Sequence, residues 1–526
     1  MEGGDGKGLR EGIPRARQIL RGIVAGVDIE YEGDRTVNRT CQNLRSAGGD
    51  AEAKVSAIIA ADVAAGKKAG PFDARPCRGF SASPIGAVPK KNGGIRVIHH
   101  LSYPYGGDSI NARTKEVPIE LGRFDDAADA IRALGKGCLL IKLDVEAAYK
   151  QVPVRRKDWP LLGFCWKGKW YYERTLPFGL KSSCRLWELY ATALHYFFVH
   201  TLGIEHVVHY IDDFLLVVEI GPASHAKLEA ALALCARVGI PMAAGKVEGP
   251  ATSLTFLGIE LCTVSMTARL SDARLAELQS LLHLWERKRV ATVKELQSLT
   301  GILNFACYVV RPGRTYLRRI IDHTIRVSKG PARLRACQID AGTLRDISWW
   351  IRFSKEFNGV GLLYEQEWTE ARSLQLFTDA CETGWGAVWG NQWIHGQWTA
   401  EELAQAGRSQ KASIPYLEML AYVFAAATWG ASWAGKKITL RSDATTVVAA
   451  VNARTSRAPA TACLLRHLST LSARHGFDVR CLHVAGVDNG AADALSRQDI
   501  PRFRALCPHA DPHPLSKPLL PPLAEM

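Results

Sequence analysis

Two adjacent carboxylates, Asp212 and Asp213, lie between two apolar runs in the stretch HVVHYIDDFLLVVEI (206–220). Each run is rich in Val, Ile, Leu, Tyr and Phe, which predicts two strands joined by a tight turn. Asp is a common turn residue, so the pair is compatible with an ordinary hairpin. Carboxylates are also the side chains that bind Mg²⁺, and two of them on one turn would form half of a cation site.

A third carboxylate, Asp144, ends an earlier apolar strand in LLIKLDVEAAYKQVPV (139–154). An Asp at this place is also a good N-cap for the turn or short helix that follows. Nucleotide-joining chemistry uses two divalent cations, one at the attacking hydroxyl and one at the triphosphate. Asp144, Asp212 and Asp213 therefore form the first candidate site.

A second candidate site consists of four acidic residues in the last third of the chain, spread over predicted elements in the order βββαβαβα. Glu418 is flanked by Tyr, Leu and Met in IPYLEMLAYVFAAATW, and an acidic residue in such an apolar setting needs a reason. Taken one at a time, Asp443 is compatible with an N-cap and Glu418 with an exposed helix position. The four residues are Asp379, Glu418, Asp443 and Asp493.

The elements that must position these residues divide the chain into five segments. Strand and helix patterns alternate in an α/β manner up to about residue 262 and then become mostly helical. Thr292-Val-Lys-Glu295 is a capping box that predicts the start of a helix. The tail PHADPHPLSKPLLPPL has the composition of a disordered segment. The predicted segments are 1–75, with no assigned function, 76–262, 263–371, 372–498 and the tail 499–526.

The chain is basic, with a net charge of +14 over 526 residues, which indicates a polyanionic partner. Residues 370–499 hold 12 Lys and Arg against 11 Asp and Glu, so nearly all of the excess lies upstream. We therefore expect the strongest contact with a polyanion in the first two thirds of the chain. Surplus Lys and Arg are also compatible with an ordinary solvated surface.

The 13 cysteines are scattered and include no C-x-x-C pair, which argues against a zinc ribbon and against a disulfide scaffold. The N-terminus has no signal-peptide core, and no apolar run is long enough to span a bilayer. We therefore expect an intracellular protein, cytoplasmic or nuclear, with no membrane partner.

The order of the first three acidic segments resembles the palm of reverse transcriptases. A strand ending in Asp144 precedes the turn and helix LPFGLKSSCRLWELYATAL (176–194), which precede the Y-I-D-D hairpin. The resemblance implies a right-hand fold of fingers, palm and thumb. It also implies that Asp144 and Asp212 bind two Mg²⁺, with Mn²⁺ as a substitute, and that Asp213 supports them. Tyr149 falls at the family's aromatic gate against the ribose 2′-hydroxyl, although core packing is an alternative role for it.

Other segments resemble the parts of that fold that hold the nucleotide and the primer. The basic turn in ASPIGAVPKKNGGIRVIHHLSYP (82–104) is similar to the fingers hairpin, with a solvated hairpin tip as the alternative. The implied dNTP contacts are Lys90, Lys91, Arg96, Tyr149, Phe178, Gly179 and Lys246. The implied primer grip is Phe256, Leu257 and Gly258. The implied thumb contacts to duplex phosphates are Arg311, Arg314, Arg318 and Arg319.

The fourth segment, with Asp379, Glu418, Asp443 and Asp493 in this order, resembles the ribonuclease H fold. In that family four carboxylates hold two Mg²⁺, which position a water against an RNA phosphate. Many ribonucleases H also carry a His in the loop before the last Asp, but the loop AGVDN has none. His483 lies within the preceding predicted strand, and we assign it no catalytic role.

The resemblance covers about residues 76–498 and indicates a retroelement protein. RVIHHLSYPYGGDSIN and DWPLLGFCWKGKWYYERTLPFGLKSS are similar to segments of DIRS-type retrotransposons, which integrate with a tyrosine recombinase. Gypsy-type elements are the next most similar. Cys184 stands where this family often has Pro, which removes no metal ligand.

The resemblance implies a multidomain α/β and α+β protein that copies RNA into DNA and degrades the RNA of the hybrid. The implied partners are an RNA template, a DNA primer, the RNA–DNA hybrid, dNTPs and other retroelement proteins such as a recombinase. One alternative is an inactive or domesticated copy that only binds nucleic acid, and another is a ribonuclease with a structural polymerase portion. All seven carboxylates are present, which favours the active enzyme.

Overall fold

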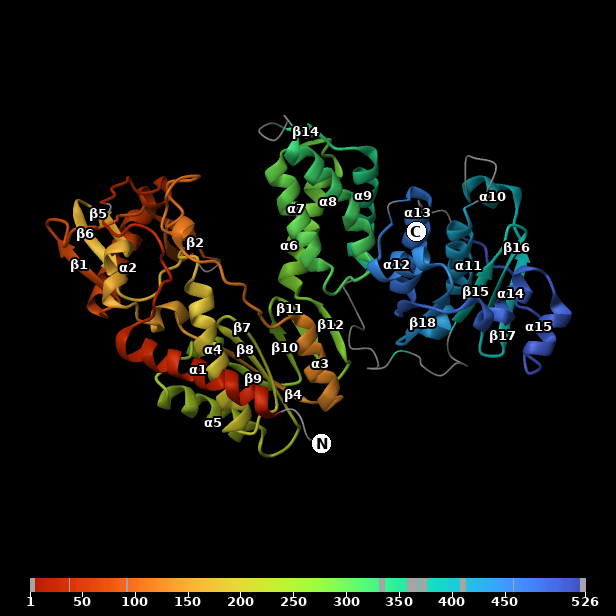
Figure 1. Ribbon diagram of the computed structural model, residues 1–526, viewed down its shortest axis with the longest axis horizontal. Helices are drawn as coiled ribbons and strands as arrows, with labels where there is room; N and C mark the ends of the chain where they lie inside the picture. Colours follow the sequence, from red (N-terminus) through yellow and green to blue (C-terminus); the bar gives the residue numbers. More distant parts are fainter. Residues whose placement is uncertain are drawn as a thin grey trace. The chain divides into compact units, whose positions relative to one another are not determined.

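The computed structural model describes residues 5–36, 38–90, 93–330, 336–356, 368, 376–406, 413–456 and 458–520. The chain divides into two compact units, whose elements are drawn in Figure 1. The first unit is Met1–Ala130 with Cys138–Thr252, and the second is Ile131–Gly137 with Ser253–Met526. Among the described residues, no helix is both long and apolar enough to cross a membrane.

A four-stranded antiparallel sheet is the centre of the first unit. Its elements are β4 (Leu139–Asp144), β7 (His206–Tyr210), β8 (Asp213–Val218) and β9 (Glu248–Ala251), with helices α4 (Ser183–His200) and α5 (Ser224–Arg237). The strand order is β7-β8-β4-β9. Strands rich in Val, Ile and Leu bury one face against these helices, and Trp187 of α4 and Phe214 of β8 are 1% and 0% exposed in the shared core.

A smaller layer of the first unit combines a three-stranded sheet, a hairpin and a helix. Its elements are β1 (Lys68–Phe72), β5 (Gly163–Trp166), β6 (Lys169–Glu173), the hairpin strands β2 (Ile85–Pro89) and β3 (Ile95–His99), and α2 (Glu52–Ala64). Val55 and Phe164 are 0% and 1% exposed in the core that these elements share. The antiparallel pairing of β2 with β3 confirms the hairpin predicted in residues 82–104.

A buried group of charged side chains ties this layer together. Lys68 Nζ lies 2.7 Å from Glu173 Oε1 and 2.7 Å from Asp62 Oδ2, while Lys150 Nζ lies 2.6 Å from Glu173 Oε2. Burial would raise the pKa of the Glu173 carboxyl, but the ammonium groups of Lys150 and Lys68 lower it to about 2. Because Glu173 bridges both ammonium groups, α2, β1 and β6 are held by one set of charges.

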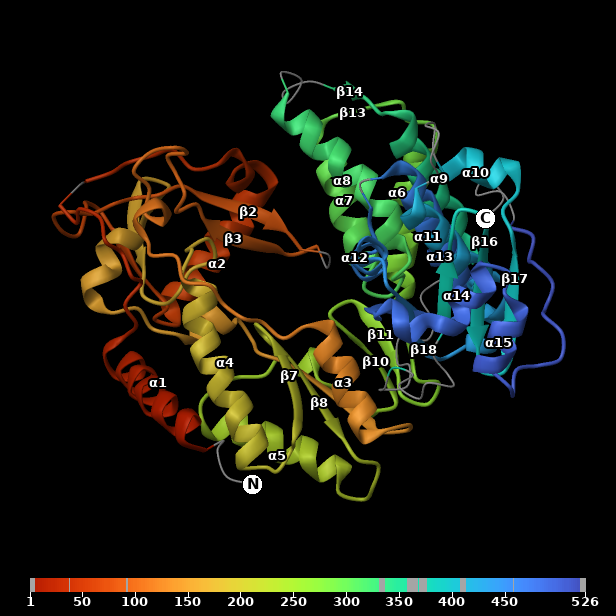
Figure 2. The ribbon, with the colours of Figure 1, turned by 45° about the vertical axis from the view of Figure 1, so that its right-hand side comes forward.

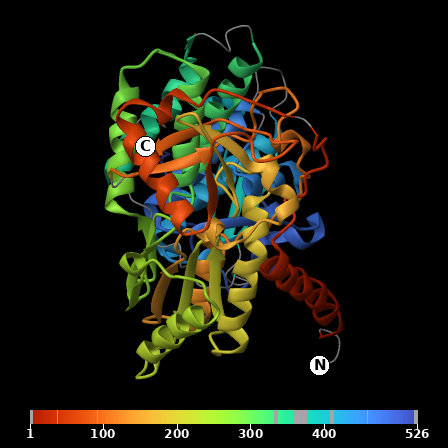
Figure 3. The same ribbon diagram turned by 90° about the vertical axis from the view of Figure 1, so that its left-hand side faces the viewer.

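The segment 1–75, to which the sequence assigned no function, belongs to the first unit. Val27, Ile29 and Tyr31 are buried in the core of the four-stranded sheet. They alternate with polar residues, and Val27 N donates to the carbonyl of Pro153 at 2.8 Å. This alternation is too short to stand out as a strand without its partner. Helix α1 (Asp5–Ala25), red in Figure 3, precedes this stretch and packs against α4.

The second unit begins with a small sheet and four helices. These are β10 (Ser253–Phe256), β11 (Ile259–Cys262), β12 (Thr267–Leu270), α6 (Asp272–Glu286), α7 (Val293–Ala306), α8 (Gly313–Lys329) and α9 (Ala341–Glu356), with the short pair β13 (Val290–Ala291) and β14 (Cys337–Gln338). The predicted capping box is confirmed. Glu295 N donates to Thr292 Oγ1 at 3.2 Å, and Thr292 N donates to Glu295 Oε2 at 2.8 Å.

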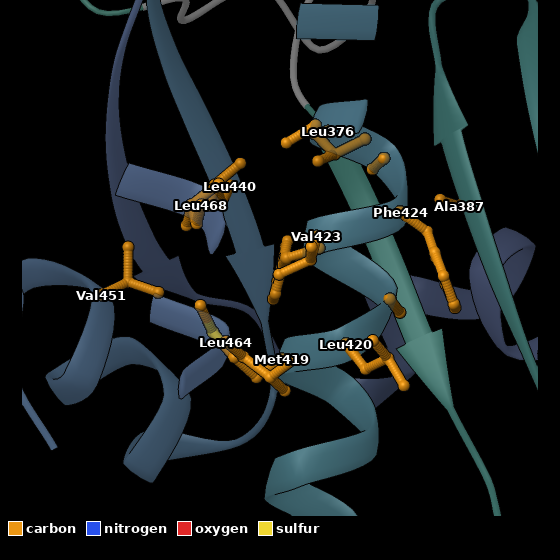
Figure 4. Close-up of a cluster of buried hydrophobic side chains, with 14 of the residues drawn as sticks. Leu376, Ala387, Met419, Leu420, Val423, Phe424, Leu440, Val451, Leu464 and Leu468 are labelled. Carbon is orange, nitrogen blue, oxygen red and sulfur yellow. The ribbon is translucent and has the colours of Figure 1, made fainter. Parts of the chain in front are cut away.

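A five-stranded sheet in the order β17-β16-β15-β18-β19 forms the rest of the second unit. Its elements are β15 (Leu376–Ala380), β16 (Gly384–Trp389), β17 (Gln392–Gln397), β18 (Lys437–Ser442) and β19 (Asp478–His483), with α10 (Ala400–Ala406), α11 (Ile414–Trp429), α12 (Thr445–Ala453), α13 (Pro459–His475) and α14 (Gly490–Ser496). Figure 4 shows Leu420 and Val423 of α11 in one buried cluster with the strand residues Leu376 and Leu440. The three successive strands predicted in 373–398 are confirmed.

Buried polar contacts join helix α8 to α13, so the helices and the five-stranded sheet belong to one unit. Tyr316 OH and Thr470 Oγ1 are 2.9 Å apart, and Thr315 Oγ1 and Ser469 Oγ are 2.7 Å apart. The predicted boundary between the third and fourth segments, at residues 371 and 372, lies outside the described residues.

The Pro-rich tail, predicted to be disordered, packs on the five-stranded sheet through residue 520. Helix α15 (Ile500–Leu506) buries Phe503 against Trp393 of β17, with ring centroids 4.9 Å apart. Further along, Lys517 Nζ lies 2.7 Å from Glu402 Oε1. Figure 2 shows α15 beside α14 and β17. The composition was misleading because the few anchoring side chains of the tail find their partners only in the folded sheet.

Replacing Glu173 with Gln should destabilise the first unit by about 3 kcal/mol at pH 7, because two buried ammonium groups lose their shared carboxylate. The lowered pKa of Glu173 means that its contribution is complete above pH 4.5 and is lost as the pH falls toward 2. The deficit of the variant should therefore shrink in acid. Urea unfolding followed by tryptophan fluorescence at pH 7 and pH 3 measures both effects.

The control is Asp73→Asn, which breaks an exposed ion pair with Lys169 and should have no measurable effect. Equal unfolding midpoints for wild type and Glu173→Gln at pH 7 would contradict the assigned role of the buried charges.

Candidate active sites

The hairpin of β7 and β8 presents the first acidic site. Asp144, the last residue of β4, lies directly opposite Asp213, the first residue of β8, in the antiparallel register. Asp212 occupies the turn between Ile211 and Asp213, and its carbonyl accepts a hydrogen bond from Val145 N at 2.9 Å. Adjacent strands lie about 5 Å apart, so the register brings the three predicted carboxylates to one end of the sheet.

The turn itself is strained, and a buried tryptophan holds it. Ile211 has φ of 58°, a left-handed conformation that a β-branched residue rarely adopts. Trp187 Nε1 of α4 donates to the carbonyl of Ile211 at 2.7 Å. This bond links the helix after the Pro-Phe-Gly-Leu turn to the acidic hairpin, which explains why the two motifs occur together in the sequence.

The three carboxylates repel one another. Burial raises the pKa of Asp213 to about 6, and the negative charges of Asp212 and Asp144 add to this. Burial also raises the pKa of Asp212, with a contribution from Asp144. Lys246, which we predicted near the triphosphate, places Nζ 2.7 Å from Asp144 Oδ2. Mg²⁺ binds to carboxylate oxygens that lie close together, as these three partly buried carboxylates do. A bound Mg²⁺ would also offset the repulsion between them.

The predicted nucleotide-contact residues Tyr149, Phe178 and Arg96 stack in one row. The rings of Tyr149 and Phe178 have centroids 5.1 Å apart, and the Arg96 guanidinium lies 4.5 Å from the centroid of Phe178. Gly179 has φ of 108°, and a Cβ there would meet the carbonyl oxygen of His99 at 2.0 Å. The turn therefore packs directly on β3, which fixes Arg96 relative to Tyr149.

One predicted contact, Lys90, directly follows β2 in the β2–β3 hairpin. Lys90 is exposed, and its N and the carbonyl of Gly94 form a 2.8 Å hydrogen bond. Lys91 lies outside the described residues. Cys184, which we noted only as a departure from the family pattern, shares a hydrogen bond with Tyr149 near the start of α4.

The predicted primer grip forms the tight turn between β10 and β11 in the second unit. Phe256 is 0% exposed and pairs with Ile259 across this turn. Leu257 and Gly258 both have positive φ, 50° and 81°. A Cβ at Gly258 would lie 3.2 Å from the Phe305 ring, so the turn packs closely against α7.

The four arginines that we predicted to contact duplex phosphates are for the most part engaged within the second unit. Arg311 Nη1 lies 3.0 Å from Asp478 Oδ2, and Arg319 Nη1 lies 3.5 Å from Asp346 Oδ1. Arg318 pairs with Asp322 one helical turn away. Arg311 and Arg319 thus pair with buried carboxylates of this unit, and their contacts with duplex phosphates stay a prediction. Arg314 is exposed on α8.

The second acidic site lies at the carboxyl ends of strands β15 and β18 in the five-stranded sheet. Strands β15 and β18 are parallel neighbours, with Phe377 opposite Arg441, so Asp379 and Asp443 follow at the same edge. Helix α11 carries Glu418, which is 7% exposed and accepts a hydrogen bond from Ser442 Oγ at 3.0 Å. The structure thus gives Glu418 a place beside this strand edge instead of an exposed helix position.

The pKa values of this second site report the same crowding. Burial raises the pKa of Glu418 to about 7, with further contributions from the charges of Asp443 and Asp379. Burial raises the pKa of Asp379 to about 6, although Ser496 Oγ donates to its Oδ2 at 2.6 Å, and the charges of Asp443 and Asp493 add to the rise. The charges of Asp443 and Asp493 therefore act on Asp379, and those of Asp443 and Asp379 act on Glu418.

Asp493 differs from the other three because two arginines neutralise it. Arg497 Nε lies 2.7 Å from its Oδ1, and Arg502 Nη1 lies 2.8 Å from its Oδ2. Burial would raise the pKa of Asp493, but these two arginines lower it. The i, i+4 spacing of Asp493 and Arg497 could have been noticed in the sequence, whereas nothing in the sequence marks Arg502.

Neither acidic site is a closed metal cage. Among the described residues, no three His, Cys, Asp or Glu side chains already surround a common point in the way cation ligands do. In the first site Asp144 pairs with Lys246, and in the second Asp493 pairs with Arg497 and Arg502. Both sites nevertheless have the oxygen donors that a hard divalent cation prefers.

The described geometry can now be compared with known proteins. Residues 88–261 match the family model for reverse transcriptase (RNA-dependent DNA polymerase). Polyprotein P3 of Commelina yellow mottle virus is 25% identical over 376 residues, which cover 70% of this chain and 18% of that protein. The Pro-Pol polyprotein of simian foamy virus type 1 is 26% identical over 225 residues, covering 43% of this chain and 18% of its own length. The chain thus spans less than a fifth of these relatives.

Solved structures show a similar mixed α/β fold. A foamy viral protease-reverse transcriptase dRH in complex with double-stranded DNA has a TM-score of 0.52 and 15% sequence identity, covering 87% of this chain and 73% of that one. A foamy viral protease-reverse transcriptase in complex with double-stranded DNA has a TM-score of 0.50 and 16% identity, covering 86% of each chain. Residues 88–261, which carry Asp144, Asp212 and Asp213, are therefore a reverse transcriptase domain of the kind found in viral polyproteins.

Proposed function

We propose that this chain is an RNA-directed DNA polymerase with ribonuclease H activity, which copies retroelement RNA into DNA and degrades the RNA of the hybrid. The observation that carries the polymerase part is the pairing of Asp144 with Asp213 across β4 and β8, with Asp212 in the adjoining turn. This arrangement lies within the matched reverse transcriptase domain. The DIRS-type lineage, with gypsy-type as the alternative, rests on the sequence segments quoted above.

In the proposed polymerase site, Asp144 and Asp212 would hold two Mg²⁺, and Asp213 would support them. When bound, these cations activate the primer 3′-hydroxyl and neutralise charge on the triphosphate. Lys246 lies on Asp144 in this structure and, once released from it, is within reach of a triphosphate as a proton donor. Arg96, held on the Phe178 ring, offers its guanidinium fork to phosphate oxygens.

In the proposed ribonuclease H site, Asp379, Glu418, Asp443 and Asp493 would hold the second pair of Mg²⁺. The support is the charge coupling of Asp379 with Asp443 and Asp493, and of Glu418 with Asp379 and Asp443. Ser442 and Ser496 orient two of the carboxylates by hydrogen bonds. The proposed partners are an RNA template, a DNA primer, the RNA–DNA hybrid, dNTPs and other retroelement proteins such as a recombinase.

Replacing Asp212 with Asn should reduce DNA synthesis by about 10³-fold or more, because a neutral amide replaces a metal-binding carboxylate. Primer extension on poly(rA)/oligo(dT) with Mg²⁺ measures this. Glu219→Gln is the matched control, since it removes an exposed carboxylate just beyond the other end of β8 and should leave synthesis unchanged. Equal synthesis by wild type and Asp212→Asn would refute the polymerase proposal, and template binding without synthesis by wild type would indicate an inactive copy.

The two activities should be separable. Asp443→Asn should reduce RNA cleavage by about 10³-fold while leaving primer extension intact. Asp144→Asn should reduce primer extension by about 10³-fold while leaving RNA cleavage intact. Each change removes one carboxylate from only one of the two sites. Extension and cleavage are measured on the same labelled hybrid. RNA cleavage by Asp443→Asn at the wild-type rate would exclude the ribonuclease H assignment.

Tyr149 should discriminate against ribonucleotides if its ring faces the ribose 2′-hydroxyl. Tyr149→Val opens this space, and we expect incorporation of rNTPs relative to dNTPs to rise about tenfold. Tyr196→Val, which truncates an exposed tyrosine of α4, is the matched control. If Tyr149→Val changes stability but not the ratio of rNTP to dNTP incorporation, the ring has only a packing role.

A further inference from the structure

Helix α15 places the guanidinium group of Arg502 at the second acidic site. Arg502 lies beyond residues 372–498, the segment in which this site was predicted. Arg502 Nη1 lies 2.8 Å from Asp493 Oδ2, and Arg497 Nε lies 2.7 Å from Asp493 Oδ1. Both oxygens of this carboxylate are therefore engaged by guanidinium groups. The side chain of Arg502 is 47% exposed, whereas that of Asp493 is 23% exposed.

The backbone of Arg502 is held firmly, although its side chain faces solvent. Arg502 N donates to Asp499 Oδ1 at 3.1 Å, which caps the helix, and the neighbouring Phe503 is 0% exposed. Arg504 donates to the carbonyls of Ala510 and Asp511, each at 2.9 Å. Helix α15 thus fixes the backbone position of Arg502, while its side chain, which faces solvent, can still change rotamer.

Residues 499–520, which we name the C-terminal strap, also follow the outer strand β17. Asp511 N donates to the carbonyl of Asn391 at 2.8 Å, and Leu515 N donates to the carbonyl of Trp393 at 3.0 Å. These bonds cover part of an edge strand whose backbone groups would otherwise be open to other chains. The strap is therefore packed on the folded domain, and it holds the backbone of Arg502 beside the four carboxylates.

The chemistry of the Arg502–Asp493 ion pair indicates that each group can exchange its partner for another ion. Arg502 competes with a divalent cation for Asp493 Oδ2, because its guanidinium occupies one lone-pair direction of this oxygen and places a positive charge beside it. A phosphodiester offers the guanidinium fork a second anion with two oxygens in suitable geometry. The RNA strand of a hybrid would bring such a phosphate to the same strand edge.

We propose that Arg502 holds Asp493 in the absence of nucleic acid and moves to an RNA phosphate when the hybrid binds, which frees Asp493 Oδ2 for a divalent cation. Arg502 is thus a substrate-binding residue that couples the entry of RNA to the assembly of the site. This inference rests on the proposed ribonuclease H function. It requires that Arg502 oppose metal binding in the free protein and favour hybrid binding.

The test is Arg502→Gln in the full chain, with two measurements expected to move in opposite directions. In an Asp212→Asn background, which weakens the first site, calorimetric titration with Mn²⁺ should give about threefold tighter binding, because a competing cation has gone. The KM for cleavage of an RNA–DNA hybrid should rise about tenfold, because a charged hydrogen bond to phosphate is lost. Arg502→Lys, which keeps the charge but not the fork, should lie between wild type and Arg502→Gln in KM.

The matched control is Arg123→Gln, which removes an exposed arginine paired with Asp126 in the first unit and should match wild type in both measurements. Weaker binding of both Mn²⁺ and hybrid by Arg502→Gln would assign the residue a structural role and overturn the inference, as would wild-type values for both. If Asp443→Asn abolishes cleavage while Arg502→Gln behaves as wild type, only this inference fails. Wild-type cleavage by Asp443→Asn would instead refute the proposed function itself.

Discussion

Repulsion between carboxylates that are held close together and partly out of water is the constraint on which both candidate sites depend. Asp213 and Asp379 have pKa values raised to about 6, and Glu418 to about 7, because burial and neighbouring negative charges disfavour ionisation. A fold does not gather such groups for stability, since each raised pKa represents free energy lost at neutral pH. Their convergence therefore supports the proposed function, in which bound cations would supply the counter-charge.

The two units bring their carboxylates together with different arrangements of strands. In the first, an antiparallel register places Asp144 opposite Asp213, and a strained turn held by Trp187 carries Asp212. In the second, the parallel neighbours β15 and β18 end at the same sheet edge, and α11 supplies Glu418 from beside it. Strand ends serve both sites because the sheet fixes the backbone there while the side chains still face outward.

Basic side chains complete this electrostatic arrangement in the absence of nucleic acid. Lys246 lies on Asp144, and Arg497 and Arg502 lie on Asp493. Elsewhere the same principle serves stability alone. Lys68 and Lys150 share the buried Glu173, and Arg311 neutralises the buried Asp478. The difference is exposure, because an arginine or lysine at a half-open site can change partners, while a buried one cannot without large cost.

Much of this protein was readable from local pattern. The hairpin of β2 and β3, the capping box at Thr292, the three strands after residue 373 and the strand positions of Asp144 and Asp213 depend on alternation, turn residues and short-range hydrogen bonds, which the sequence carries directly. The seven acidic residues were likewise identifiable from their order along the chain.

What the sequence by itself determined was therefore the identity and order of the acidic residues and the elements that carry them. Only the tertiary structure decided which basic residues form ion pairs with these acidic residues. Arg502, predicted to lie in a disordered tail, contacts Asp493, whereas Arg311 and Arg319, predicted to bind phosphates, neutralise internal carboxylates. The physical reason is that an ion pair depends on distance in space, and residues far apart in sequence acquire that distance only when helices and sheets pack.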